Sequence, residues 1–218
     1  MRFLQTLLFG AAMFITLSSC AQKTKNQQPK SSKNDLSKYS VATFAAGCFW
    51  HEEALFESVK GVQEAISGYA GGNTKSPSYE SLETGNTGHA ETVNVYYDSS
   101  VINYPTLLKV YFAAQDPTSP NGQAPDFGTQ YRSILFYRNN TEKLLAENYI
   151  KQLNASRKYN KPVAVQVVPF VKLWEAEVYH QDFIQHNPNQ GYVQAVSIPE
   201  IKKFQKEYPQ LIKKDHIY

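Results

Sequence analysis

The order of hydrophobic and polar positions predicts short strands that alternate with helices from about residue 40 onward. Val93, Val95 and Tyr97 alternate with more polar neighbours, as in a half-buried strand, whereas residues 52–59 carry apolar side chains at helical spacing. The expected strands are 41–45, 62–69, 90–98, 131–137 and 163–168, and the expected helices are 52–59, 105–114 and 141–160, with a short one after Pro199. This β-α-β-β-α-β order predicts an α+β fold, a two-layer ferredoxin-like α/β sandwich with helices on one face of the sheet and a long irregular C-terminal segment.

The first residues have the pattern of a secretory signal. Arg2 precedes an apolar stretch, Phe3 to Leu17, that is too short for a comfortable membrane span. The run Leu17-Ser18-Ser19-Cys20 resembles the cleavage box of bacterial lipoproteins, in which the cysteine becomes the lipidated first residue. Several acyl chains give stable anchoring, so we expect export and a lipid anchor on Cys20 that holds the protein to a bacterial membrane, in the cell envelope and on its periplasmic face. Ordinary secretion or a chance cysteine is the alternative.

Composition divides the chain into a signal peptide at 1–19, a lipid-anchored disordered tether at 20–38 and one domain at 39–218. The tether is rich in Lys, Gln, Asn and Ser and has almost nothing to bury. Residues 1–38 hold six basic residues and one acidic residue, a net +5, so the full-chain charge of +3 leaves −2 for the domain. The basic pI of 8.7 is therefore a property of the N-terminal part, and the charge gives no support for nucleic-acid binding.

Cys48 is the single cysteine after residue 20, and it stands where a strand gives way to a helix. At a helix N-terminus, unpaired N–H groups and the helix dipole stabilise a thiolate, so we expect the pKa of this thiol to be lowered below about 8.5. Phe49 and Trp50 follow directly and offer an apolar surface beside the sulfur. The pattern predicts a nucleophile facing an apolar ligand; the alternative is an inert buried cysteine.

Polar clusters elsewhere contain candidate partners for this thiol. They are Pro77-Ser78-Tyr79, Gly88-His89-Ala90-Glu91, Asp126 to Ser133, and Tyr179-His180-Gln181-Asp182. A carboxyl such as Glu91 in a partly dry aromatic pocket has a raised pKa and can act as an acid, although a solvated strand-end carboxylate is the simpler alternative. No ligand spacing links Cys48, His51, His89 and His180, so we expect no metal.

Two other functions use the same residues differently. In a hydrolase, Cys48 is the nucleophile and His180 or His89 the base, which leaves Phe49 and Trp50 without a clear task. In a binding module, the aromatic pocket holds a thioether or a peptide, and the thiol has no task.

Together these stretches resemble the A-type peptide methionine sulfoxide reductases. The matching segments, in the family's order and over about 150 residues, are Gly47-Cys48-Phe49-Trp50, Gly68 to Gly72, Pro77-Ser78-Tyr79, Gly85 to Glu91, Tyr97-Asp98, Gly128 to Ser133 and Ala176 to Gln181. The resemblance implies a two-layer α+β catalytic domain, expected to be a monomer, that reduces the S epimer of methionine sulfoxide in oxidised proteins or as the free amino acid, without a cofactor.

The resemblance also implies a role for each site residue. Phe49 and Trp50 seat the methyl group on the substrate sulfur. Glu91, Tyr79 and Tyr131 donate hydrogen bonds to the sulfoxide oxygen, and Cys48 attacks the sulfur and becomes a sulfenic acid. Asp126 holds the backbone N–H or amine of the substrate. His180 lies near the site, either in contact with the substrate or behind the residues that are.

Two positions depart from the family pattern. His51 stands where a small residue is more common, and Val193 follows Gly191-Tyr192 where many relatives have a resolving cysteine. No cysteine lies downstream of Cys48, so we expect an external thiol to regenerate it directly. A thioredoxin-like protein, a glutaredoxin-like protein or a small-molecule thiol would serve.

Overall fold

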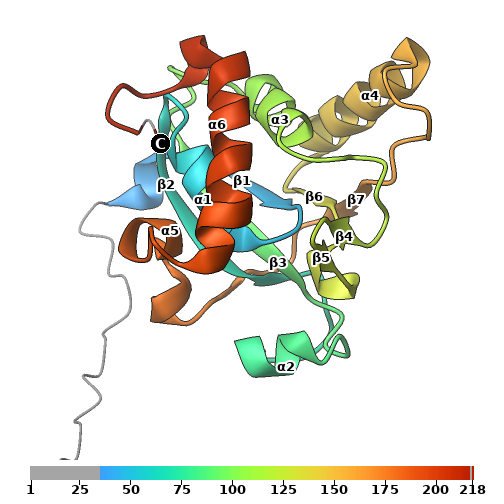
Figure 1. Ribbon diagram of the computed structural model, residues 1–218. Coiled ribbons are helices and arrows are strands. Elements are labelled where there is room, and N and C mark those ends of the chain that lie inside the picture. The colour runs from blue at the N-terminus through green and yellow to red at the C-terminus, as the bar shows by residue number, and fades with distance from the viewer. Residues whose placement is uncertain (1–34, 217) are drawn as a thin grey trace, which may run out of the picture.

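The computed structural model describes residues 35–216 and 218 (Figure 1). The strands of the main sheet are β1 (Ser40–Ala45), β2 (Val62–Ala70), β3 (Ala90–Tyr97), β6 (Ile134–Tyr137), β7 (Gln166–Pro169) and β8 (Trp174–Glu175), and β4 (Gly122–Gln123) pairs with β5 (Asp126–Phe127). The α-helices are α1 (Phe49–Glu57), α2 (Tyr79–Glu83), α3 (Tyr104–Ala113), α4 (Asn140–Ser156), α5 (Phe183–His186) and α6 (Ile198–Glu207). Short 3-10 turns cover Leu36–Lys38, Thr129–Tyr131, Val178–His180 and Pro209–Leu211, and a π-helical turn covers Val193–Ser197.

The sheet has the order β7-β6-β1-β3-β2-β8. Neighbouring strands are antiparallel except β6 and β7, which are parallel and joined through α4. Within it, the unit β1-α1-β2-β3-α3-β6 has the strand order β6-β1-β3-β2, which is that of a ferredoxin-like fold. The predicted fold class is therefore confirmed, with β7 and β8 as additions at the two edges.

Several predicted boundaries were wrong by a few residues. The strand expected from Tyr131 begins at Ile134, because Thr129–Tyr131 forms a 3-10 turn. The helix expected to reach residue 160 ends at Ser156, because Arg157 adopts a left-handed conformation with φ of 55°. The loop at 71–88 contains the helix α2, which begins with a capping box formed by Ser78 and Ser81.

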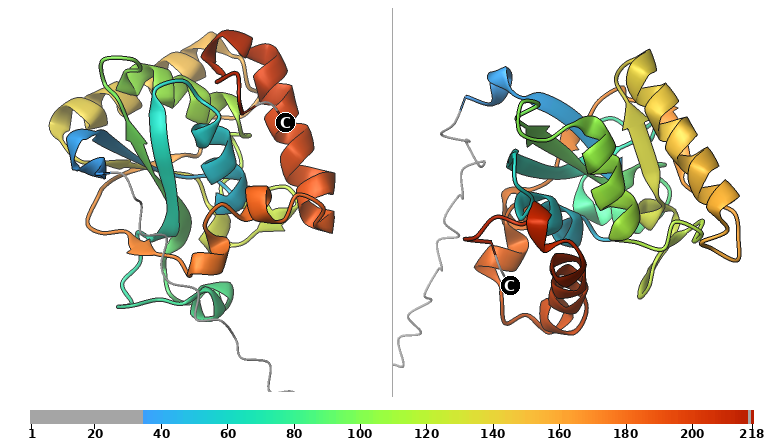
Figure 2. Two further views of the ribbon diagram at one scale, coloured as in Figure 1. Left: turned by 90° about the vertical axis from the view of Figure 1, so that its left-hand side faces the viewer. Right: turned by 90° about the horizontal axis from the view of Figure 1, so that it is seen from above.

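The main core lies between the sheet and the helices α1 and α3, so helices cover one face of the sheet as predicted (Figure 2). Phe44 of β1 points into this core and stacks on Phe56 of α1, with ring centroids 5.1 Å apart. The opposite face carries a smaller cluster that includes Ala45 and Phe136 and packs against Phe170 and Leu173. Those two residues belong to the segment that leads from β7 at one edge of the sheet to β8 at the other.

Helix α1 is buried on all sides. Every residue except Trp50 is buried, including His51 and Glu52, because the sheet covers one side while α5 and α6 cover the other. Figure 2 shows α1 between the sheet and α6. The C-terminal segment thus provides the outer wall of the helix that begins at Cys48.

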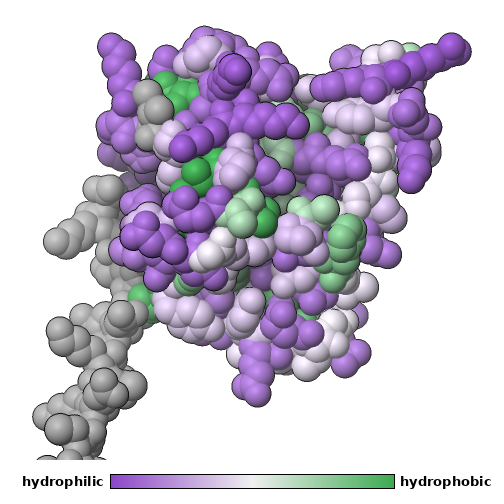
Figure 3. Space-filling view, viewed as in Figure 1, coloured by the Kyte–Doolittle hydropathy of each residue, from purple (hydrophilic) through white to green (hydrophobic). Residues whose placement is uncertain are grey.

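The surface in Figure 3 is mostly hydrophilic, with hydrophobic side chains in small separate areas. Over residues 35–216 and 218, none of the helices has the length and apolar character that a membrane span requires. The predicted signal peptide, Cys20 and most of the tether lie outside the described residues. Of the tether, residues 35–38 are described, and they form the 3-10 turn that Asp35 caps.

Candidate active site

A turn at Gly47 places Cys48 at the N-cap of α1. Gly47 has a φ of +70°, and a Cβ atom there would lie 2.8 Å from the Cβ of Gln123, so glycine is required. The Gly47 N–H donates to the carbonyl of Tyr131 at 3.1 Å, which fixes the turn against the next loop. The partly exposed thiol therefore stands at the start of a helix, as predicted from the sequence.

The prediction that this position lowers the pKa of the thiol was wrong. Burial raises the pKa of Cys48 well above the range of a free thiol, and the neighbouring acids Glu91 and Asp126 raise it further wherever they are ionised. The backbone N–H groups of Trp50 and His51 lower the pKa, but burial raises it by more. The resting site therefore holds a protonated thiol, and deprotonation must accompany the reaction.

Glu91 is a buried acid beside this thiol. Its side chain is 2% exposed, and its Oε2 accepts a hydrogen bond from the Phe49 N–H at 2.8 Å. Burial raises the pKa of Glu91 well above its usual value, and the bond from Phe49 offsets only part of that rise. Glu91 is therefore not a solvated strand-end carboxylate, and it can donate a proton near neutral pH.

Two phenols lie near Glu91. Burial raises the pKa of Tyr79 and of Tyr131, and the charge of Glu91 is the next contribution to both. Tyr79 begins α2, where its N–H donates to Oε1 of Glu177 at 2.9 Å. The Tyr131 hydroxyl donates to Oε1 of Glu83 at 3.1 Å, so it must leave that partner before it can bind a substrate.

The aromatic side chains after Cys48 are fixed by rings from the C-terminal segment. Phe49 is 1% exposed, and Trp50 stacks on Phe183 with centroids 3.6 Å apart and planes within 6°. The Trp50 indole N–H donates to Nδ1 of His180 at 2.9 Å, and the ring meets Tyr192 edge-on. The indole is therefore oriented by contacts from residues 180–192.

Neither candidate histidine base for a hydrolase is directed at Cys48. His180 accepts from Trp50, and burial lowers its pKa to about 4, so it is neutral. His89 is also buried; its Nδ1 accepts from the Gly72 N–H at 3.1 Å and its Nε2 lies 2.8 Å from the Thr74 carbonyl. His180 therefore orients the indole, and His89 fixes the loop at 71–88.

Asp126 is positioned by the small β4–β5 hairpin, and the Tyr192 hydroxyl donates a short hydrogen bond to its Oδ2. Tyr192 also lies within hydrogen-bonding reach of Cys48, which contributes to raising the pKa of the phenol. In the sequence, Gly191-Tyr192 indicates only that Val193 and not a cysteine follows this pair. The same pair is the sequence signal from which Tyr192 could have been predicted as a site residue. In the structure, the Tyr192 hydroxyl lies between Asp126 and Cys48.

Arg132 ties the loops of the site together. Its guanidinium donates to the carbonyls of Gly88 at 2.9 Å and Thr129 at 2.6 Å, and lies 3.4 Å from that of His89. These bonds join the segment that leads into Glu91 to the turn that carries Tyr131. The hydrogen bonds from Arg132 to these backbone carbonyls thereby hold the segments of Glu91 and Tyr131 together.

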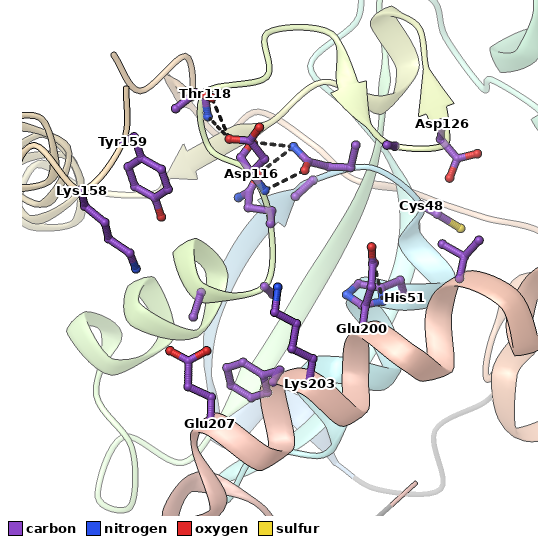
Figure 4. A pocket seen from close by; sticks show the side chains of 18 of the residues that line it. Cys48, His51, Asp116, Thr118, Asp126, Lys158, Tyr159, Glu200, Lys203 and Glu207 are labelled. Atoms are coloured by element: carbon purple, nitrogen blue, oxygen red, sulfur yellow. Dashed lines mark hydrogen bonds and ion pairs between the residues drawn. The ribbon is translucent and has the colours of Figure 1, made fainter. Parts of the chain in front are cut away.

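A cleft of about 660 Å³ opens beside Cys48 (Figure 4). Asp126 and Tyr192 line it close to Cys48, and His51 and Glu200 lie next to each other along its wall. Phe49, Trp50, Tyr79, Glu91 and Tyr131 do not line this cleft. Cys48 therefore has two different surroundings. One is the group formed by Phe49, Trp50, Tyr79, Glu91 and Tyr131, and the other is the open cleft.

A ferredoxin-like α+β fold with a thiol at a helix start, beside a buried carboxyl with a raised pKa and the aromatic side chains of Phe49 and Trp50, defines a cysteine-based enzyme. The chain belongs to the peptide methionine sulfoxide reductase family, which matches residues 40–212.

Known relatives match nearly their whole length. The peptide methionine sulfoxide reductase MsrA of Sulfolobus acidocaldarius is 46% identical over 169 residues, which are 78% of this chain and 95% of the relative. MsrA 1 of Rhodopirellula baltica is 43% identical over 173 residues, covering 79% and 89%. Among solved structures, reduced Mxr1 from Saccharomyces cerevisiae is similar with a TM-score of 0.68 and 30% identity, over 75% of this chain and 93% of that one. The oxidoreductase assignment predicted from the sequence is thus confirmed.

Proposed function

We propose that the protein reduces methionine S-sulfoxide, in oxidised proteins or as the free amino acid, and that Cys48 passes through a sulfenic acid. The observation that carries this proposal is the buried acid Glu91, hydrogen-bonded to the backbone of the residue that follows the nucleophile. A sulfoxide oxygen must be protonated before its sulfur becomes a good electrophile, and a carboxyl with a raised pKa supplies that proton.

The reaction uses the two sides of the substrate differently. The methyl group contacts Phe49 and Trp50, while the oxygen accepts hydrogen bonds from Glu91, Tyr79 and Tyr131. Glu91 gives its proton to the oxygen as the Cys48 sulfur attacks the substrate sulfur and forms an S–S bond, and the thiol proton passes to Glu91. The hydroxyl group then moves from the substrate sulfur to the Cys48 sulfur as that S–S bond breaks, which oxidises Cys48 to a sulfenic acid and releases methionine.

Asp126 is the group that would hold the substrate's backbone N–H or amine. Its side chain is only partly buried and lines the cleft beside Cys48. The Tyr192 hydroxyl donates to one of its oxygens and so fixes the orientation of the carboxyl group. A carboxylate held in this way can accept a second hydrogen bond from the substrate.

Regeneration is proposed to use an external thiol from a thioredoxin-like protein, a glutaredoxin-like protein or a small molecule. The chain has two cysteines, Cys20 and Cys48, and a lipidated Cys20 has no free thiol. Val193, which stands where relatives have a resolving cysteine, is fully buried. None of the proposed steps uses a metal or an organic cofactor.

The test is an assay of the chain with both sulfoxide epimers and dithiothreitol as reductant. We expect turnover of the S epimer alone, and a Cys48→Ser variant that still binds the sulfoxide but forms no methionine. Mass spectrometry after one turnover without reductant should find one added oxygen on Cys48. Turnover of the R epimer alone would contradict the proposal, and full binding without any reduction by the wild type would favour a binding module.

Export and lipid anchoring on Cys20 are proposed from the N-terminal pattern, and repair of oxidised envelope proteins is the task that this location implies. In a bacterial host, the wild type should be recovered with membranes and carry acyl chains on Cys20. A Cys20→Ala variant should lose both properties while its sulfoxide reduction is unchanged. A Cys20–Cys48 disulfide in native membranes would contradict both the anchor and the external reductant.

A further inference from the structure

The cleft beside Cys48 has the right position for the second half of the reaction. When Cys48 becomes a sulfenic acid, its oxygen lies among Glu91, Tyr79 and Tyr131, the groups proposed to bind it in the first half. Displacement at a divalent sulfur is in line, so a reducing thiol must approach opposite the S–O bond. None of those three residues lines the cleft, whereas Cys48 does.

The wall of the cleft carries a histidine and a carboxylate that the first half-reaction does not use. His51 is 6% exposed, and its ring lies against the backbone of Ser197. Its Nδ1 lies 3.7 Å from Oε2 of Glu200, whose side chain is 49% exposed. Glu200 thus faces the cleft with His51 directly behind it, as Figure 4 shows.

Charges around this pair come from three elements. Glu52 on α1 interacts with Glu200, and Lys203 on α6 and Asp126 on β5 act on Glu200 with opposite signs. Lys158 and Tyr159 line the far end of the cleft (Figure 4). The volume of about 660 Å³ falls within the range of sites that hold small ligands.

We propose that the reducing thiol enters through this cleft and that Glu200, positioned by His51, accepts its proton. This inference rests on the proposed external regeneration of Cys48. The incoming sulfur forms an S–S bond with Cys48 as the S–O bond breaks. The thiol proton goes to Glu200, Glu91 protonates the oxygen, which leaves as water, and exchange with solvent then returns a proton to Glu91 and removes one from Glu200. The thiol is oxidised and the sulfenic sulfur reduced; a second thiol attacks the mixed disulfide, its proton goes to the Cys48 sulfur, and a free disulfide leaves.

The experiment measures the two half-reactions separately in two variants, Glu200→Gln and His51→Ala. Sulfoxide reduction is measured as the methionine formed in one turnover without reductant. Regeneration is measured as steady-state turnover, with dithiothreitol in one arm and reduced thioredoxin in another. We expect Glu200→Gln to keep the single-turnover rate and to lose about 10-fold to 100-fold in steady-state turnover. This loss is at or below the lower end of general-base effects, because thiols also ionise in water. A loss in both arms indicates a route that both reductants share, and a loss in one arm assigns the route to that reductant.

A pH profile distinguishes proton transfer from a structural effect. Burial raises the pKa of Glu200, so regeneration by the wild type should slow as the pH falls through that value, and Glu200→Gln should lack this limb. His51→Ala should shift the limb. The control is Glu147→Gln, which removes an exposed carboxylate on α4, away from the cleft.

Two outcomes would overturn the inference: steady-state turnover of Glu200→Gln equal to that of the wild type, or an equal loss in the single turnover. Failure of the proposed function has a different signature. In that case the wild type itself forms no methionine without reductant, or Cys48 carries no added oxygen.

Discussion

Glu52 gives the sharpest test of how burial in α1 changes the pKa of a carboxyl group. It is 1% exposed, and neither carboxylate oxygen has a hydrogen-bond partner. Burial raises the pKa of Glu52 to about 8, and the nearby charge of Glu200 contributes to the rise. Glu52 is therefore protonated in the folded protein at neutral pH, whereas in the unfolded chain it ionises near pH 4.3.

The sign and size of the effect follow from proton linkage. Between about pH 4.3 and pH 8 the folded state binds one more proton than the unfolded state, so stability falls by about 1.4 kcal/mol per pH unit. The stability that protonated Glu52 allows is fully present below the pKa of the unfolded chain, and it is lost as the pH rises toward the pKa of the folded protein. At pH 7 the loss is on the order of 4 kcal/mol.

Glu52→Gln has nearly the same shape and cannot ionise. We expect this variant to be more stable than the wild type by about 4 kcal/mol at pH 7, and to be equally stable near pH 4. For a domain of this size the gain corresponds to about 8–16 °C in Tm. Glu200→Gln should show a smaller pH dependence than the wild type, because it removes a charge that raises the pKa of Glu52.

The assay is urea unfolding followed by tryptophan fluorescence at several pH values from 4 to 8. The difference in unfolding free energy between variant and wild type isolates Glu52 from the other buried groups that titrate. Glu147→Gln serves as the control, since its exposed side chain should change stability by a few tenths of a kcal/mol at every pH. A stability difference that does not grow with pH, or one of the opposite sign, would refute the reasoning.

Two further predictions concern the site itself. In Glu91→Gln the amide oxygen can still accept a hydrogen bond from the Phe49 N–H, but the side chain has no acidic proton to give. The rate of single-turnover methionine formation should therefore fall about 10²-fold to 10⁴-fold, while the protein stays as stable as the wild type. An unchanged rate would exclude Glu91 as the acid. His180→Phe keeps a ring in place but leaves the Trp50 indole N–H without its acceptor. The free energy of unfolding should therefore fall by about 1–3 kcal/mol, and KM for the sulfoxide should rise by a larger factor than kcat falls. A variant with the KM of the wild type would show that His180 does not orient the indole.

The strands of the ferredoxin-like core could be predicted because their alternation is local. Val93 and Val95 face the main core as their spacing indicates, and β1 and β2 pair with β3 along most of their length. Helix α1 could not be judged in the same way. His51 lies beside Glu200 of α6, and the helices α5 and α6 that pack on α1 belong to segments more than 120 residues away.

The same distinction holds for the site. Cys48 and Glu91 could be predicted as a pair because each belongs to a recognisable segment, and the structure brings both to the Phe49 backbone. The contacts of Tyr192 with Asp126 and of Glu200 with His51 depend on how the C-terminal segment folds back. No periodicity in the sequence encodes which side chains such a segment presents to α1.

The thiol of Cys48 shows how burial can outweigh a helix terminus, and alkylation measures the balance. Backbone N–H groups at a helix start lower the pKa of a cysteine, whereas dense surroundings and nearby carboxylates raise it, and in Cys48 the second group of effects is the larger. We therefore expect iodoacetamide to label Cys48 more slowly than free cysteine at pH 7.5, with a rate that keeps rising above pH 9. Urea-unfolded protein is the control for reagent access, because it should label at the rate of a free thiol. Rapid labelling of the folded protein at pH 7, with a plateau by pH 8, would show that the helix terminus prevails and that the resting nucleophile is a thiolate.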